Sequence, residues 1–321
     1  MAEFYDVFNG DADGLCALLQ LRLATPRDAV IVTGVKRDTE LLQQVDAQQG
    51  DQIVVLDISL DTNREALQRV LRSGASVSWF DHHFPGDIPV HSALTSNIDT
   101  NPRICTSLIV DRHLNGRFRA WAIVAAFGDN LEASAREAAA TLNLESGDTE
   151  LLRELGVCLN YNAYGDSIND LLFSPADLFG RLRSFADPRE FIRHSDVFES
   201  LRERMRHDLQ QAHAVPVIEL GQASACAVLP DTSWSRRVVG VYANELARQY
   251  PARAHAVLVA RAGGHAVSIR APIENPRGAA TIARAFHSGG GREGAAGINF
   301  LPASGTDRLL DAMRTNYRRT D

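Results

Sequence analysis

The sequence lacks paired cysteines and long hydrophobic runs, and we expect it to have no secretory leader; each of these points argues against a class of protein. The four cysteines are scattered and form no CxxC pair, so neither a zinc knot nor a redox dithiol is evident: Cys16, Cys105, Cys158 and Cys226. The first residues turn acidic at Glu3, which is not the start of a secretory signal. Apolar runs such as 121–127 fall far short of the roughly 20 residues that span a bilayer. We therefore expect a cytoplasmic protein that does not bind membranes.

An excess of positive charge is also missing. Lys and Arg number 33 against 40 Asp and Glu, which gives a net charge of −7. A net acidic protein has no overall field that attracts long nucleic acid, although a local basic groove remains compatible with it. Hydrophobic residues make up 45% of the chain and charged residues 23%, as in ordinary globular proteins.

The pattern of the chain predicts an α/β protein of two domains. Four short runs rich in β-branched or aromatic residues alternate with segments of helical period: 4–8, 29–33, 52–56 and 76–80. This alternation predicts a parallel, doubly wound sheet with helices on its faces, and the nearly continuous apolar strands suit burial on both sides. We expect this N-terminal domain to span residues 1–187 and to become mostly helical from about residue 103.

A long polar stretch with apolar residues at helical spacing follows, and we interpret residues 188–214 as a linker helix. Beyond it, β-rich runs return at 224–229, 255–260 and 265–269, then a helical stretch at 277–286 and a glycine-rich segment at 287–297. Residues 215–321 are therefore predicted to form a smaller, mixed α/β domain.

Four short segments of the N-terminal domain carry acidic residues and histidines at or near the ends of apolar runs: GDADG with Asp11 and Asp13, LDIS with Asp57, FDHH with Asp81, His82 and His83, and GDN with Asp129. Each segment alone is equally typical of a helix cap or a turn. In a parallel sheet, however, strand ends meet at one edge, where ligand sites form. Carboxylates gathered there repel each other unless cations are bound.

Oxygen ligands combined with imidazole suit Mn²⁺, or Mg²⁺ with bound water, better than thiolate-preferring metals. Several carboxylates can hold two ions about 3.5–4 Å apart, the arrangement used in two-metal phosphoryl hydrolysis. The sequence thus predicts a metal centre, with two Mn²⁺ ions expected and Mg²⁺ as the alternative.

The order and spacing of these four motifs resemble the DHH phosphoesterase superfamily. That group includes RecJ-type exonucleases, nanoRNases, cyclic-dinucleotide phosphodiesterases, exopolyphosphatases and a class of inorganic pyrophosphatases. The segment HSGGGREGAAG at 287–297 resembles the GGGHxxAAG signature of the DHH-associated C-terminal domain, and Ser268-Ile269-Arg270 resembles its substrate-contacting strand. The resemblance covers nearly the whole chain.

The resemblance implies a role for each metal-site residue. Asp11 would hold one ion, Asp13 the other, and Asp57 would bridge both. His82 and Asp129 would complete the shell of the second ion, and water between the ions would attack phosphorus.

Two neighbours of the predicted ligands are assigned catalytic roles by the same resemblance. Asp81 would orient His82, and His83 would face the substrate phosphate and stabilise developing charge. A further segment, Cys105-Thr106-Ser107, lies where relatives carry polar residues near the metals, but its residues alone indicate only a turn and a helix cap.

Two positions depart from the family pattern. Val7 stands where many members have a histidine that binds the first ion, although RecJ-type members lack it too. Arg292 stands where a histidine follows the glycine triplet, and an arginine still binds phosphate, in a bidentate manner.

The glycine triplet Gly289, Gly290 and Gly291 permits a ligand to approach the backbone closely, yet it is equally typical of a tight turn. Because Arg292 adjoins it and Arg270 lies nearby in sequence, we favour phosphate or nucleotide binding by these five residues. No Lys-Ser/Thr pair follows, so we do not expect ATP binding in the manner of a nucleotide P-loop.

We expect a Mn²⁺-dependent phosphoesterase that hydrolyses short nucleotide substrates, such as short oligonucleotides, adenosine 3′,5′-bisphosphate or a linear dinucleotide. Its partner would be a small phosphorylated or nucleotide molecule or short single-stranded nucleic acid, and a homodimer is compatible with the sequence. The alternatives are an exopolyphosphatase or pyrophosphatase, and a non-catalytic nucleotide-binding protein.

Overall fold

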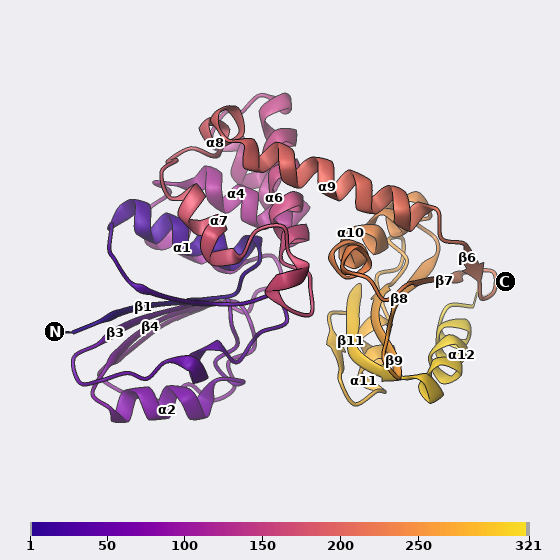
Figure 1. The fold of residues 1–321 in the computed structure, drawn as a ribbon, viewed down its shortest axis with the longest axis horizontal. Coiled ribbons are helices and arrows are strands. Elements are labelled where there is room, and N and C mark those ends of the chain that lie inside the picture. Colours follow the sequence, from indigo (N-terminus) through magenta and orange to yellow (C-terminus); the bar gives the residue numbers. More distant parts are fainter. Residues whose placement is uncertain (1, 319–321) are drawn as a thin grey trace. The chain divides into compact units, whose positions relative to one another are not determined.

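The computed structural model describes residues 2–318, except for the side chain of Ser146. The chain divides into two compact units, Met1–Arg202 and Glu203–Asp321. The first contains a five-stranded parallel sheet covered by helices and the second a six-stranded mixed sheet, which confirms the predicted fold class (Figure 1). Within the described residues, no helix combines the length and the hydrophobicity that crossing a bilayer requires.

The sheet of the first unit contains β1 (Phe4–Phe8), β2 (Val30–Thr33), β3 (Gln52–Leu56), β4 (Ser76–Asp81) and β5 (Leu94–Ile98). All neighbours pair in parallel, in the order β2-β1-β3-β4-β5. The direction of winding therefore reverses between β1 and β3, which makes their carboxyl ends a topological switch point. The sequence pattern found the first four strands but missed β5, because this edge strand carries the polar run Thr95, Ser96 and Asn97.

Helices cover both faces of this sheet. The face shown below the strands in Figure 1 is covered by α2 (Arg64–Arg72), and α1 (Ala12–Ala24), α4 (Arg119–Gly128) and α6 (Ser146–Asn162) lie on the opposite side. Further helical elements of the unit include η1 (Leu41–Gln44), α3 (Thr106–His113), α5 (Glu132–Ala140), η2 (Ile168–Asp170) and α7 (Pro175–Leu182). The helical stretch predicted from residue 103 onward is thus present.

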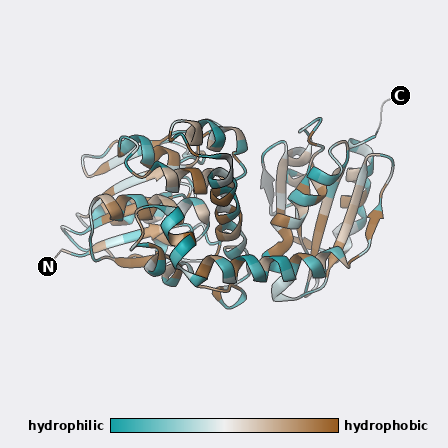
Figure 2. Ribbon diagram, turned by 90° about the horizontal axis from the view of Figure 1, so that it is seen from above, coloured by the Kyte–Doolittle hydropathy of each residue, from teal (hydrophilic) through white to brown (hydrophobic). Residues whose placement is uncertain are grey.

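The hydrophobic core on the α2 side joins side chains of the central strands to the helix. Val7, Val55 and Trp79 are fully buried there against Leu67 and Val70 of α2. The Nε1–H group of Trp79 donates to the Ile58 carbonyl at 3.1 Å, so the one polar atom of this indole is satisfied within the core. Hydrophobic residues mark the strands of both sheets in Figure 2.

The prediction of a single linker helix over 188–214 is wrong, because two helices occupy this segment: α8 (Pro188–His194) and α9 (Asp196–His213). Ser195 between them is extended, with φ −119° and ψ 135°, and its hydroxyl accepts from the Val197 amide at 3.3 Å. This side chain therefore restarts the helix. The position of the domain boundaries otherwise stays a prediction, and α9 begins in the first unit and ends in the second.

The sheet of the second unit has the order β10-β11-β9-β8-β7-β6, with β7 and β8 parallel and the other pairs antiparallel. The strands are β6 (Val217–Glu219), β7 (Ser224–Leu229), β8 (Ala254–Arg261), β9 (Gly264–Arg270), β10 (Gly289–Gly291) and β11 (Ala295–Pro302), and the helical elements are α10 (Ser233–Gln249), α11 (Ala279–Arg284), η3 (Ala303–Gly305) and α12 (Thr306–Asn316). The glycine triplet, whose sequence is also typical of a tight turn, forms the edge strand β10.

Candidate metal centre

The predicted metal-site residues of the first unit converge at the carboxyl edge of its sheet. Asp11 and Asp13 follow β1 across the switch point from Asp57, which follows β3. Asp81 ends β4, directly before His82 and His83. Asp129, at the end of α4, belongs to the same group, since electrostatic interactions with Asp11, Asp13 and His82 all act on it.

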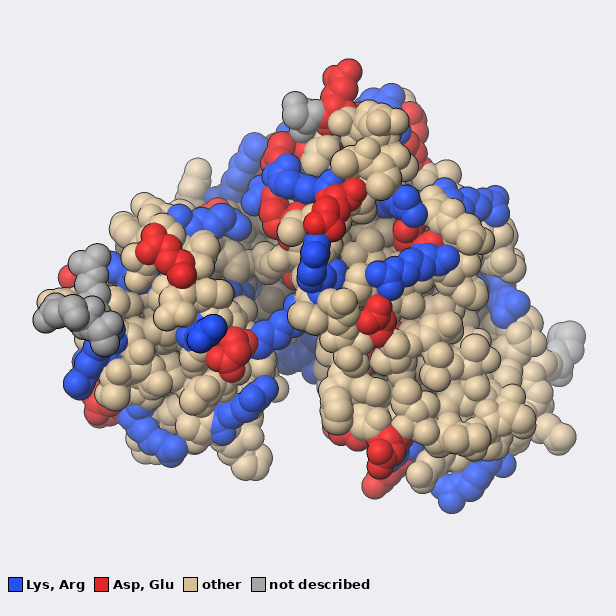
Figure 3. Space-filling model, turned by 180° about the vertical axis from the view of Figure 1, so that it is seen from behind, with Lys and Arg blue, Asp and Glu red and all other residues tan. Residues whose placement is uncertain are grey.

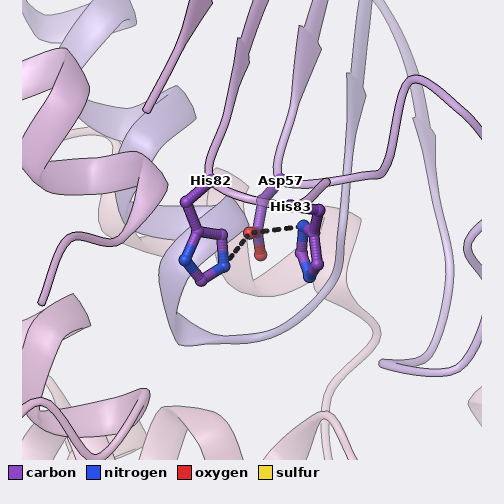
Figure 4. A group of neighbouring side chains, drawn as sticks. All are labelled: Asp57, His82 and His83. Carbon is purple, nitrogen blue, oxygen red and sulfur yellow. Dashed lines mark ion pairs between the residues drawn. The ribbon is translucent and has the colours of Figure 1, made fainter. Parts of the chain in front are cut away.

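Asp57 lies at the centre of this group. Its backbone has φ 59°, a left-handed conformation that few non-glycine residues adopt. The conformation is held by a hydrogen bond from the Asp57 amide to the Phe80 carbonyl at 3.1 Å. Figure 4 shows that the Asp57 carboxylate lies between two imidazoles: its Oδ1 atom is 3.4 Å from Nε2 of His82 and 4.0 Å from Nδ1 of His83. One ligand atom from each of the three lies within 4.8 Å of the others, a spacing that fits a metal ion.

The tautomer of His82 is fixed by the backbone rather than by a carboxylate. Its Nδ1 atom lies 2.9 Å from the Ile104 carbonyl oxygen, which can only accept, so Nδ1 carries the proton. The lone pair is then on Nε2, the atom that faces Asp57, as a metal ligand requires. The role assigned to Asp81 on this histidine is therefore wrong, because the Asp81 side chain contacts only the backbone amide of His82, at 2.8 Å.

Asp81 instead holds the second histidine. The buried Oδ1 atom of Asp81 accepts from Nδ1 of His83 at 2.7 Å, while the His83 ring remains half exposed. Burial alone would lower the pKa of His83, but the hydrogen bond and the negative charge of Asp81 raise it above the ordinary value. His83 is thus an oriented side chain at the exposed side of the centre, as its predicted contact with a phosphate requires.

The start of α3 holds two of the aspartates, a role that the sequence reasoning discounted. The amides of Thr106 and Ser107 each donate to one oxygen of Asp13 at 2.7 Å, and the Thr106 hydroxyl donates to Asp57 Oδ1 at 3.0 Å. The positive end of a helix thereby faces a carboxylate. Each carboxylate oxygen of Asp13 keeps a second lone pair, so these contacts leave it able to bind a metal.

The centre carries more negative charge than its own side chains neutralise. Burial raises the pKa of Asp57 well above its usual range, and the charges of Asp11, Asp13 and other neighbouring aspartates raise it further. The pKa of Asp129 is raised as well, mainly by burial. A divalent cation beside Asp57 would relieve this repulsion, and carboxylates with a lone-pair imidazole are donors that Mn²⁺ accepts. The residues present therefore fit a metal ion at Asp57 and His82.

Lys36 is a member of the site that the sequence reasoning missed. It follows β2, and its ammonium group donates to Asp11 Oδ2 and to Asn160 Oδ1, the latter at 3.2 Å. Burial alone would raise the pKa of Asp11, but the Lys36 charge lowers it to about 2. A signal was available in the composition, since Lys36 is the single lysine among the 33 Lys and Arg residues of the chain.

The substrate-binding residues predicted for the second unit occupy two places in its sheet. Arg270 ends β9, and its guanidinium is oriented by Asn244 Oδ1 at 2.6 Å and Ser268 Oγ at 3.0 Å. The triplet Gly289–Gly291 pairs with β11, and Arg292 turns the chain back, its amide donating to the Ala295 carbonyl at 2.9 Å. Arg270 and the Arg292 turn are joined through β11, because Arg270 pairs with Ala295.

The two units differ in charge. Residues 203–321 contain fifteen Arg against ten Asp and Glu, a net charge of +5, which leaves −12 for residues 1–202. Both signs are spread over the face shown in Figure 3 rather than gathered in one large basic patch. A net basic second unit suits a small anionic ligand.

Comparison with solved structures places this fold in a known class. The fold matches that of the exonuclease RecJ bound to manganese, with a TM-score of 0.64, 16% identity and coverage of 99% of this chain and 91% of that one. RecJ in complex with Mn²⁺ from Thermus thermophilus matches with a TM-score of 0.61 and 18% sequence identity. The match covers 99% of this chain and 52% of that RecJ. The pGpG-specific phosphodiesterase PggH from Vibrio cholerae matches with 0.54 and 15% over 99% of both chains. The chain therefore shares the fold of RecJ and PggH, which are members of the superfamily that the motifs resemble.

No protein-family profile and no curated protein sequence matches the chain.

Proposed function

We propose that the protein is a Mn²⁺-dependent phosphoesterase that hydrolyses phosphodiester or phosphomonoester bonds of short nucleotide substrates. The observation that carries the proposal is the convergence of Asp11, Asp13, Asp57, His82 and Asp129 at the carboxyl ends of adjacent parallel strands and at the end of α4. The fold that places them there is shared with RecJ in its manganese-bound form. A divalent ion bound by these residues would supply Lewis-acid chemistry, polarising a phosphoryl oxygen and making water more acidic.

The protein's own side chains would hold the ion and stabilise the charge that develops on the substrate. His82 would present Nε2 to the ion because its Nδ1 proton is committed to the Ile104 carbonyl. Asp57 would hold the ion, with its carboxylate positioned by the Thr106 hydroxyl. His83, oriented by Asp81 and half exposed, would donate a hydrogen bond to a phosphate oxygen and stabilise the charge that develops there.

The second unit would recognise the substrate through its arginines. The Arg270 guanidinium is held rigidly by Asn244 and Ser268, so less rotamer entropy is lost when it binds a phosphate. A small nucleotide is favoured over a long strand because the chain as a whole is acidic and has only 7% aromatic residues for base stacking.

A substrate panel with Mn²⁺ tests the proposal. Linear dinucleotides such as pGpG, short oligonucleotides, adenosine 3′,5′-bisphosphate and polyphosphate would be compared by released nucleotide and phosphate, with Asp57→Asn as the inactive control. We expect hydrolysis of nucleotide substrates that chelation abolishes. Turnover of polyphosphate alone would favour the exopolyphosphatase alternative. Nucleotide binding without turnover in saturating Mn²⁺ would favour the alternative of a non-catalytic nucleotide-binding protein.

A further inference from the structure

The candidate metal centre contains a cation that belongs to the protein itself, the ammonium group of Lys36. The Lys36 side chain reaches Asp11 from β2, the strand beside β1, and is fixed at several points. The Lys36 amide donates to the Ala163 carbonyl at 2.9 Å, and the Lys36 carbonyl accepts from Asn9 Nδ2 at 3.0 Å. The Nζ atom donates to Asp11 and lies 5.7 Å from the centre of the Tyr164 ring. Because backbone and head group are both anchored, the ammonium is a built component of the centre.

Both carboxylate oxygens of Asp11 accept hydrogen bonds from groups of the chain. Its Oδ1 atom accepts from the amides of Asp13 at 3.0 Å and Gly14 at 3.2 Å, which caps the start of α1. Its Oδ2 atom accepts from the Lys36 ammonium. A metal ion at Asp11 would have to displace this ammonium, or share the oxygen with it at the cost of placing two positive charges side by side.

The second ligand expected for an ion at this place is also missing. Val7 stands at the position of the family histidine and is fully buried in the core on the α2 side, where it supplies no donor atom. An ion beside Asp11 would therefore lack the imidazole ligand that many family members supply there. At the other side of Asp57, by contrast, the unprotonated Nε2 atom of His82 lies 3.4 Å from Asp57 Oδ1.

We propose that the Lys36 ammonium takes the place of one of the two metal ions, so that the centre holds a single divalent ion at Asp57 and His82 with Lys36 beside Asp11. This inference rests on the proposed function, because it concerns the metal content of the same site. An ammonium neutralises a carboxylate without dissociating, and it has three N–H donors, of which Asp11 and Asn160 take two. The third would donate to a phosphate oxygen, the contact that the replaced ion would otherwise supply.

The test measures manganese stoichiometry in the full-length protein by equilibrium dialysis and by Mn²⁺ EPR. Wild type, Lys36→Gln and the matched control Arg37→Gln are compared. Arg37 is the neighbouring cation, but it pairs with Asp166 at 2.6 Å, and both side chains are about one third exposed, 37% and 34%. We expect one isolated Mn²⁺ per chain in the wild type and in Arg37→Gln, and a second, spin-coupled Mn²⁺ in Lys36→Gln.

Two spin-coupled ions in the wild type, or a single ion in Lys36→Gln, would overturn the inference while leaving the proposed function intact. No ion in the wild type would overturn the proposed function together with the inference. Hydrolysis of the substrate panel separates the two failures, since a two-ion wild type should still turn over.

A second measurement does not depend on the folding of any variant. Because Lys36 is the single lysine, [¹³C]lysine labelling produces one lysine spin system in the whole chain. We expect that saturating Mg²⁺ leaves this signal with the broad line of an immobilised side chain, and that one equivalent of Mn²⁺ broadens it beyond detection. A narrow signal typical of a mobile surface lysine in Mg²⁺ would mean that the ion displaces Lys36, which would overturn the inference.

Discussion

The Nδ1 atom of His83 lies 2.7 Å from Oδ1 of Asp81, and the same oxygen accepts from the backbone amide of His82 at 2.8 Å. Asp81 is fully buried, whereas the His83 ring is half exposed. The aspartate of the DHH motif therefore orients the exposed imidazole, and the metal-facing imidazole of His82 is oriented by a backbone carbonyl.

This division of roles predicts the effect of Asp81→Asn. The variant keeps the shape of the side chain but removes the charge that holds His83, so we expect kcat to fall roughly 10–100-fold. Bound manganese should be unchanged, because no metal-facing atom of His82 depends on Asp81. Metal analysis and steady-state kinetics check this, with His82→Ala as the variant that should lose metal. Loss of manganese from Asp81→Asn would instead show that Asp81 supports the metal.

Thr106 provides a second test. Its hydroxyl donates to Asp57 Oδ1 at 3.0 Å from the first residue of α3. Thr106→Val removes the donor at nearly constant volume, and we expect Mn²⁺ to bind about 10–100-fold more weakly, as measured by calorimetry. Thr106→Ser keeps the hydroxyl and should bind like the wild type. Equal affinities of the valine and serine variants would argue against this role.

Sequence reasoning located the acidic residues and histidines but not the groups that hold them. Strand-end positions could be read from period and composition, because β1, β3 and β4 are short, mostly apolar runs that end at ligand-type residues. The partners Ile104, Thr106 and Lys36 come from other segments, and their contacts depend on how loops fold over the sheet edge. No local pattern encodes such a contact. The lone lysine was visible, but only the structure shows that it reaches Asp11.

Substitutions at two positions of the glycine triplet, Gly289 and Gly290, distinguish a role in packing from a role in ligand binding. A Cβ atom at Gly289 would lie 1.8 Å from the Ala283 carbonyl oxygen, whereas one at Gly290 would have no atom within 4 Å. We expect Gly289→Ala to destabilise the second unit by about 1–3 kcal/mol and Gly290→Ala by less than about 0.5 kcal/mol, as measured by urea unfolding.

The same pair tests the predicted role of this strand in substrate binding. If β10 approaches a phosphate closely, Gly290→Ala should raise KM at unchanged stability. An unchanged KM in Gly290→Ala would restrict the role of the triplet to packing.

His255 on β8 predicts how the second unit responds to acid. Its side chain is fully buried, next to the Tyr250 ring with centroids 5.9 Å apart. Burial, aided by the charge of Arg253, lowers the pKa of His255 from 6.5 to about 4. The unfolded chain therefore binds this proton more readily than the folded one, and stability is lost as pH falls from about 6.5 towards 4, by at most about 3 kcal/mol. The loss should be confined to the second unit.

Hydrogen exchange of the β8 amides at pH 7 and pH 4.5, corrected for the intrinsic exchange rate, measures this loss directly. His255→Gln removes the titrating group at similar size and should flatten the pH dependence, whereas His287 is exposed and His287→Gln serves as the control. Protonation of a buried imidazole that has no partner for its charge destabilises the folded state, so the wild type should be the more acid-sensitive protein. Equal acid sensitivity of the wild type and His255→Gln would mean that another group controls the response.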